Sequence, residues 1–159
     1  YRDLSHLVGG ADYINPNKPA GVVRASVFTS EPNHIHRFGM PLTFEFEIVF
    51  QEKPVSGGFS FQVVDEQMRP IMHLWLLDSE KRWSRSGKVR LRCLVPRPRI
   101  YMGHYSLITY LSDRASLYDY ERLDGICPFE VVMEGTPGEY QWTPGACTYL
   151  EDAQWSVAD

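Results

Sequence analysis

The sequence lacks several features that mark easily recognised classes of protein. Its longest uninterrupted apolar run is Leu74 to Leu77, whereas a membrane-spanning helix needs about 20 apolar residues. It carries 16 Lys and Arg against 20 Asp and Glu, for a formal net charge of −4. It therefore has no basic excess of the kind that binds nucleic acids or anionic lipids. A membrane span and a nucleic-acid-binding tail are both excluded.

Cysteine is also scarce. Cys93, Cys127 and Cys147 are an odd number, far apart, with no Cys-x-x-Cys pair and no Cys/His spacing typical of zinc. We expect free, mostly buried thiols, as in a reducing compartment. The sequence has no Asn-x-Ser/Thr acceptor, and its N-terminus does not have the pattern of a signal peptide. These features predict a cytoplasmic location.

Common catalytic motifs are missing as well. Gly87-Lys88 lacks the first glycine of a phosphate-binding loop, where Arg82 stands instead. Ser60 lacks the second glycine of a nucleophile elbow. There is no His-Glu-x-x-His helix and no glycine-rich dinucleotide loop. We therefore predict no catalytic residue, no metal and no cofactor.

One histidine pair is a weak metal candidate. On a strand, His34 and His36 would point to the same face, as metal ligands do. A metal site needs three or four convergent ligands, and Glu45 could complete this one only through tertiary proximity. We expect two structural histidines in a surface loop.

Two acidic residues form a second candidate pair. Glu45 and Glu47 would lie on one strand face, whereas glycoside hydrolysis needs carboxylates about 5–9 Å apart across a cleft. Lys88, Arg90 and Arg92 form a matching basic stripe. We expect cross-strand ion pairs between the two sets, each worth about 0.2–1 kcal/mol. The alternative for the basic stripe is a wall of donors for an acidic sugar or a phosphate.

What the sequence does contain is period-two alternation and many aromatic residues, with 9 Tyr, 8 Phe and 4 Trp. No window of 11 or more residues shows a helical period, and turn residues separate short alternating segments. This pattern predicts an all-β fold, an immunoglobulin-like antiparallel β-sandwich, with a jelly roll as the alternative. Tyr105 has the position of a tyrosine corner. The expected strands span residues 21–29, 42–50, 59–63, 70–77, 88–93, 103–111, 127–133 and 146–150, with 112–125 as a polar connection.

The same alternation turns a set of aromatic and polar side chains away from the core. Aromatic rings cover the apolar face of a pyranose, and neighbouring amide, imidazole and phenol groups bind its hydroxyls. The alternatives are that Trp75 points into the core, or that the face is a dimer or domain interface. The candidate carbohydrate-binding residues are Ser60, Gln62, His73, Trp75, Ile108 and Tyr110.

Four segments in this order resemble a known family. They are Phe44 to Phe50, Gly58 to Asp65, Met72 to Trp75 and Gly103 to Leu107. Their order and spacing are similar to those of the C-terminal domain of Wzt, the ATP-binding subunit of ABC exporters of O-antigen polysaccharide. The resemblance covers about residues 21–133.

The resemblance implies a non-catalytic carbohydrate-binding domain. Such a domain would bind the modified non-reducing end of a lipid-linked O-antigen polysaccharide and so select finished chains for export. It implies an ATP-binding domain upstream in the same chain and a transmembrane exporter subunit, at the inner face of the inner membrane. It also implies a homodimer, in some members formed by exchange of a C-terminal strand, for which residues 145–150 are the candidate.

The expected organisation has three parts. Residues 1–20 form a linker or N-terminal arm, residues 21–133 the β-sandwich carbohydrate-binding domain, and residues 134–159 a C-terminal extension with a swapped or docked strand. The chain begins with Tyr1 rather than Met, so we expect a piece of a longer polypeptide. A small β-sandwich enzyme acting on glycans and a pure dimerisation module remain the alternative functions.

Overall fold

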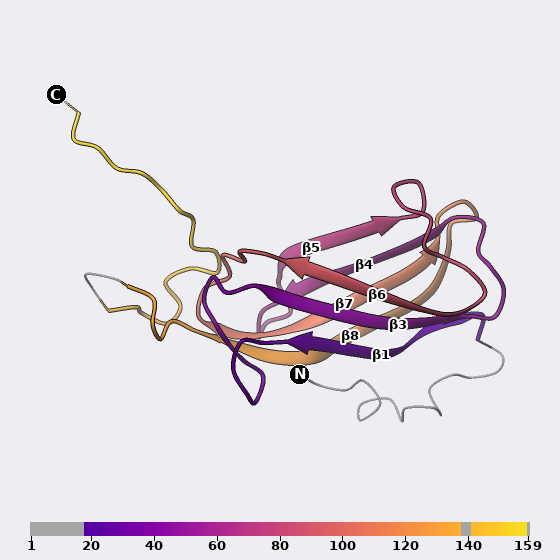
Figure 1. Ribbon diagram of the computed structural model, residues 1–159, viewed down its shortest axis with the longest axis horizontal. Helices are drawn as coiled ribbons and strands as arrows, with labels where there is room; N and C mark the ends of the chain where they lie inside the picture. The colour runs from indigo at the N-terminus through magenta and orange to yellow at the C-terminus, as the bar shows by residue number, and fades with distance from the viewer. Residues whose placement is uncertain (1–17, 138–140, 159) are drawn as a thin grey trace.

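The computed structural model describes residues 18–137 and 141–158, and most of the expected linker lies outside them. The described residues form an all-β fold (Figure 1). They contain no helix that is long and apolar enough to cross a membrane. The strands are β1 (Ala20–Phe28), β2 (Ile35–Arg37), β3 (Leu42–Phe50), β4 (Gly57–Val64), β5 (Pro70–Leu77), β6 (Gly87–Val95), β7 (Gly103–Asp113) and β8 (Tyr118–Val132).

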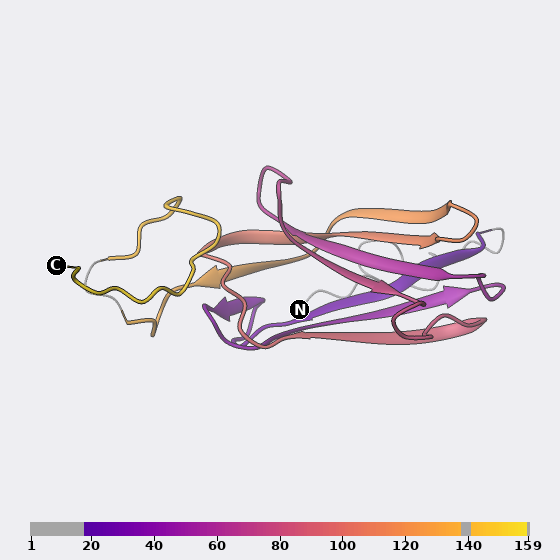
Figure 2. The same cartoon turned by 90° about the horizontal axis from the view of Figure 1, so that it is seen from above.

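These strands form two sheets, as predicted for a β-sandwich. One sheet has the order β1-β3-β6, and the other has the order β2-β8-β7-β4-β5. All neighbours are antiparallel except β2, which runs parallel to β8. Figure 2 shows β3 and β6 in one layer and β7 and β8 in the other. The predicted all-β sandwich is confirmed. In the larger sheet, β4 lies between β7 and the edge strand β5.

The core lies between the two sheets and, among the described residues, contains six buried phenylalanines among mainly aliphatic residues. Alternate residues of β3 are buried, from Leu42 to Phe50. Across the interior, the ring of Phe44 lies 4.8 Å from that of Phe61, and the ring of Phe46 lies 4.8 Å from that of Phe59. Burying each of these side chains is worth about 1.5–3 kcal/mol. The contacts fix the inner faces of β3 and β4 and therefore also their outer faces.

The predicted polar connection over residues 112–125 was wrong. β7 continues to Asp113, and β8 begins at Tyr118, so only a short turn separates them. The first part of β8 contains many charged residues, and several of its side chains face solvent. One that does not is Glu121, which accepts a hydrogen bond from the Val22 backbone at 3.0 Å and contacts Lys18. This carboxylate ties β8 to the β1 edge of the other sheet.

The predicted tyrosine corner is confirmed. The Tyr105 hydroxyl donates a buried hydrogen bond of 2.7 Å to the Tyr101 carbonyl oxygen. Burial raises the pKa of Tyr105 to about 12. Gly103 has a φ of +154°, and a Cβ there would lie 3.3 Å from the Tyr105 hydroxyl. Glycine at this position therefore lets the tyrosine ring reach back to the crossing loop.

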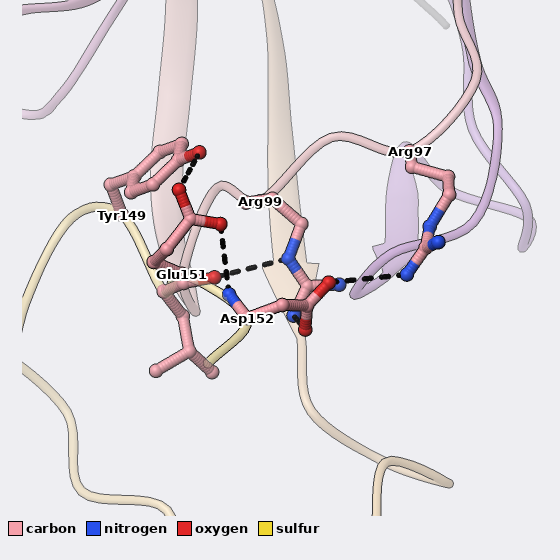
Figure 3. Close-up of polar contacts among 6 residues, drawn as sticks. Arg97, Arg99, Tyr149, Glu151 and Asp152 are labelled. Carbon is pink, nitrogen blue, oxygen red and sulfur yellow. Dashed lines mark hydrogen bonds and ion pairs between the residues drawn. The ribbon is translucent and has the colours of Figure 1, made fainter. Parts of the chain in front are cut away.

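The predicted C-terminal strand is reduced to a single antiparallel bridge between Tyr149 and Ile100 of the same chain. Two backbone hydrogen bonds flank it, from Tyr101 to Thr148 at 3.0 Å and from Leu150 to Arg99 at 2.8 Å. The carboxylate of Asp152 binds the guanidinium groups of Arg99, at 2.6 Å, and Arg97, at 3.2 Å; Figure 3 shows the three side chains together. The segment therefore docks on its own chain.

The histidine pair does not form a metal site. His34 has a φ of 62° and lies outside β2, so it does not share a strand face with His36. His36 is 1% exposed, which corrects the expected surface position. Its Nδ1 accepts a hydrogen bond from the Ser30 backbone at 3.0 Å, and its Nε2 lies 2.8 Å from the Met40 carbonyl oxygen. Both ring nitrogens are thus used by the backbone, and the ring is neutral with its proton on Nε2.

The tyrosine corner predicts the effect of Tyr105→Phe. This variant leaves the carbonyl oxygen of Tyr101 buried without its partner, so the free energy of unfolding should fall by about 1–3 kcal/mol. Urea denaturation measures the loss. Tyr118→Phe, at an exposed position, serves as the control and should change stability little. An unchanged midpoint for Tyr105→Phe would show that the hydrogen bond contributes nothing.

His36 predicts a loss of stability in acid. Burial lowers the pKa of His36 below its ordinary value. Because the unfolded chain takes up a proton near pH 6.5 and the folded chain resists it, stability is fully present above that pH. It is lost as the pH falls from 6.5 through the lower pKa of the folded state. The nearby charge of Glu31 opposes the shift without reversing it.

The measurement is urea denaturation from pH 7.5 to pH 5 for the native chain and for His36→Asn. The side-chain oxygen of asparagine can accept the Ser30 bond but does not titrate. The stability difference between the two proteins should shrink as the pH falls. A constant difference across this range would contradict the account. The pKa of His73 is also lowered by burial, but His73 is present in both proteins and cancels.

Candidate functional site

The outer face of the five-stranded sheet carries the candidate carbohydrate-binding residues. Ser60 of β4 pairs with Trp75 of β5 and with Tyr110 of β7, and Gln62 pairs with His73. Residues directly opposite on neighbouring strands point to the same face of a sheet. The inner face is fixed by the buried phenylalanines of β4, so this set points outward. Trp75 is 55% exposed, which excludes its position in the core.

Three aromatic rings lie next to one another on this face. The His73 ring is 4.7 Å from the Trp75 ring and 5.8 Å from the Tyr110 ring. The Nε2 atom of His73 lies 3.0 Å from the Ser60 hydroxyl, and the Tyr110 hydroxyl donates to Gln62 Oε1 at 2.9 Å. Burial lowers the pKa of His73, so the ring is neutral at pH 7. Two residues of β4 therefore hold one ring each from the neighbouring strands β5 and β7.

These rings line an open pocket of about 600 Å³. This volume lies within the range of small-molecule sites, which is about 300–1,000 Å³. The floor is formed by β4 at Gly58 and Ser60, and the aromatic wall by Trp75, His73 and Tyr110. The pocket combines exposed ring faces with fixed hydrogen-bonding groups, which is the combination that a sugar requires.

Two of the candidate residues contribute differently from expectation. Ile108 is 3% exposed, so its expected place on the accessible face was wrong. It pairs with Gln62 on the outer face, but β7 has a neighbouring strand on each side, where surrounding side chains cover an aliphatic residue. Gln62 does not line the pocket and acts through its hydrogen bond to Tyr110. Ser60, Trp75, His73 and Tyr110 are brought together.

Two arginines of this pocket, Arg114 and Arg122, were not predicted from the sequence. The guanidinium of Arg122 lies over the Tyr110 ring at 5.3 Å, and that of Arg114 lies 6.0 Å from the Trp75 ring centre. Both belong to the stretch that was expected to be a connection. Extending the alternation back to Tyr118 would have paired Arg122 with Tyr110.

The paired glutamates lie elsewhere, on the outer face of the three-stranded sheet. Arg92 binds Glu45 at 2.8 Å, Arg90 binds Glu47 at 3.0 Å, and Lys88 lies 3.9 Å from Glu47. The predicted cross-strand ion pairs are confirmed. Since the basic side chains are largely exposed, each pair is worth at most about 1 kcal/mol. The carboxylates point the same way and do not face each other across a cleft.

The cysteines are not part of the pocket. Cys93, Cys127 and Cys147, all described residues, form no disulfide, as predicted, but only Cys127 is fully buried. Burial raises the pKa of the Cys93 thiol, which makes it less reactive. Among the described residues, no group of three or more His, Cys, Asp or Glu side chains is arranged to hold a metal ion.

The comparisons with known proteins give a likeness in structure only. No family model matches the sequence, and no curated protein does. The solved C-terminal domain of Wzt is similar over 99% of this chain and 97% of that one, with a TM-score of 0.68 and 12% identity.

Two other solved structures have TM-scores of 0.45, which is too low to bear on function. A β-D-mannosidase from Dictyoglomus thermophilum is 17% identical and matches over 68% of this chain and 13% of its own. A Niemann-Pick type C2 protein from the Japanese carpenter ant is 6% identical and matches over 70% of this chain and 96% of its own. The C-terminal domain of Wzt, in contrast, matches over nearly the whole length of both chains. The chain therefore has the fold of the C-terminal domain of Wzt.

Proposed function

We propose that this chain is a non-catalytic carbohydrate-binding domain whose site is the aromatic pocket on the outer face of the five-stranded sheet. The observation that carries the proposal is the exposed Trp75 ring beside His73, 4.7 Å away, in a pocket of about 600 Å³. The Trp75 side chain is 55% exposed, so covering its ring with apolar surface would lower the free energy. The C–H face of a sugar supplies such an apolar surface.

The pocket binds by stacking and by hydrogen bonds together. The ring of Trp75 covers the C–H face of a pyranose, and the groups of Tyr110 and His73 contact its hydroxyls. Both polar rings are already held, by Gln62 and Ser60 respectively. Little side-chain freedom is therefore lost when the sugar binds. The pocket is open and wet, so the affinity for a single sugar unit should be modest.

The fold likeness supports a more specific role. The domain would recognise the modified non-reducing terminus of a lipid-linked O-antigen polysaccharide and so select finished chains for an ABC exporter. Residues 21–133 would form this domain, with residues 1–20 as a linker and 134–159 as an extension. The partners would be an ATP-binding domain upstream in the same chain, a transmembrane exporter subunit and a second copy of this chain, at the cytoplasmic face of the inner membrane.

Trp75→Ala tests the site. We expect it to weaken binding to the recognised polysaccharide at least about tenfold, because stacking on an aromatic ring is lost. The probes are O-antigen polysaccharides, each with its terminal modification intact and removed, measured by titration calorimetry. Trp155→Ala is the matched control, since Trp155 is 93% exposed in the C-terminal segment, and it should bind normally.

If Trp75→Ala binds as tightly as the native chain, the pocket is not the binding site. If both forms of each polysaccharide bind equally, the domain does not recognise the terminal modification.

A reducing-end assay on the same mixtures tests whether the domain is an enzyme. Turnover that Glu45→Gln abolishes would overturn the non-catalytic role. Light scattering covers the third function. A Trp75→Ala protein that becomes monomeric and still binds glycan would make this face a dimer interface.

A further inference from the structure

We propose that the sugar bound in this pocket carries an anionic group, a carboxylate or a phosphoryl group, and that Arg114 binds it. The inference rests on the proposed function, because it specifies the ligand of the same pocket. It is carried by the placement of Arg114, by the absence of an acidic partner for it among the described residues, and by the glycine beneath it.

Arg114 directly follows β7, and its side chain lies flat across β4. Its backbone N–H donates to the Ser56 carbonyl oxygen at 2.8 Å, which fixes the start of the side chain. A Cβ at Gly58 would lie 2.8 Å from the Cγ and 2.9 Å from the Cδ of Arg114. Any side chain at position 58 would therefore displace the arginine stem. Gly58 lets the stem lie on the strand and brings the guanidinium within 6.0 Å of the Trp75 ring.

Arg114 lines the pocket, and its guanidinium faces the Trp75 ring. The guanidinium makes no hydrogen bond or ion pair within residues 18–137 and 141–158. In contrast, Arg122, which also lines the pocket, is bound to Asp124 at 2.9 Å. A guanidinium presents five N–H donors in a planar fork that fits a carboxylate or phosphoryl group in two-point contact. Arg114 therefore offers an unused anion-binding group beside the stacking ring.

Two acidic residues, Glu121 and Asp119, line the pocket and reduce its positive charge. Glu121 lines it, but its carboxylate is 3% exposed and is bound by Lys18 and the Val22 backbone. Asp119 also lines the pocket and forms no ion pair with Arg114, both being described residues. The pocket is not strongly positive as a whole. Anion binding here depends on direct contact with Arg114, and the Asp119 charge opposes it.

The test uses matched sugars that differ only in charge. The probes are the methyl glycosides of glucose, galactose and mannose, the corresponding uronic acids and the corresponding 6-phosphates. Titrations are followed by NMR through the indole N–H signal of Trp75. We expect at least one acidic probe to bind at least about tenfold more tightly than its neutral parent, with a preference that weakens as salt is added. The uronic acid and phosphate arms show which anion is preferred.

Three variants isolate the arginine. In Arg114→Gln the ratio of acidic to neutral affinity should fall to about one, and Gly58→Val should have the same effect by displacing the stem. Asp119→Asn should raise the ratio. Arg90→Gln, a change on the other sheet that also removes one positive charge, should leave the ratio unchanged and so controls for net charge.

The outcomes separate this inference from the proposed function. If neutral sugars perturb Trp75 as strongly as acidic ones, or if Arg114→Gln leaves the ratio as it is in the native chain, the anionic ligand is wrong and the sugar site stands. If Arg114→Gln weakens both classes equally, Arg114 is a general contact and the inference is also overturned. If no sugar and no polysaccharide perturbs Trp75, both proposals fail.

Discussion

The packing of phenylalanine rings between the two sheets is the constraint on which the rest of the structure depends. Phe44 and Phe46 of β3 meet Phe59 and Phe61 of β4 at ring distances of 4.8–5.0 Å. Because side chains alternate across a strand, a shift of one residue in β4 would turn these rings to solvent and is strongly disfavoured. The same alternation obliges Ser60 and Gln62 to point outward. The candidate binding face is thus the outer side of the sheet whose inner side forms part of the core.

The outer face gains its order from β4, which lies between β5 and β7. β4 supplies short polar side chains, and the strands on either side supply the rings that they hold: His73 to Ser60 and Tyr110 to Gln62. Trp75 is left as the large exposed aromatic surface beside them. The hydrogen bonds also explain why Gln62 matters to the pocket without lining it, and Gly58 leaves room on the same strand for Arg114.

Much of this could be predicted from the sequence because alternation is a local signal. It gave the strands of the core, the outward direction of Trp75 and the pairing of Glu45 with Arg92 across neighbouring strands. The start of β8 was missed because its charged residues resemble a loop when their partners on β7 are unknown. The burial of Ile108 depends on its neighbours in the sheet, and that of His36 on a loop that wraps around its ring. Such contacts join residues whose proximity is set only by the fold.

The most direct measurement is the set of intermolecular nuclear Overhauser effects between a bound oligosaccharide and the protein. The account predicts contacts from sugar C–H protons to the ring protons of Trp75, with further contacts to His73 and Tyr110. Contacts confined to the three-stranded sheet, for example near Glu45 and Arg92, would contradict it. So would contacts confined to the docked C-terminal segment around Tyr149, because both surfaces lie outside the aromatic pocket.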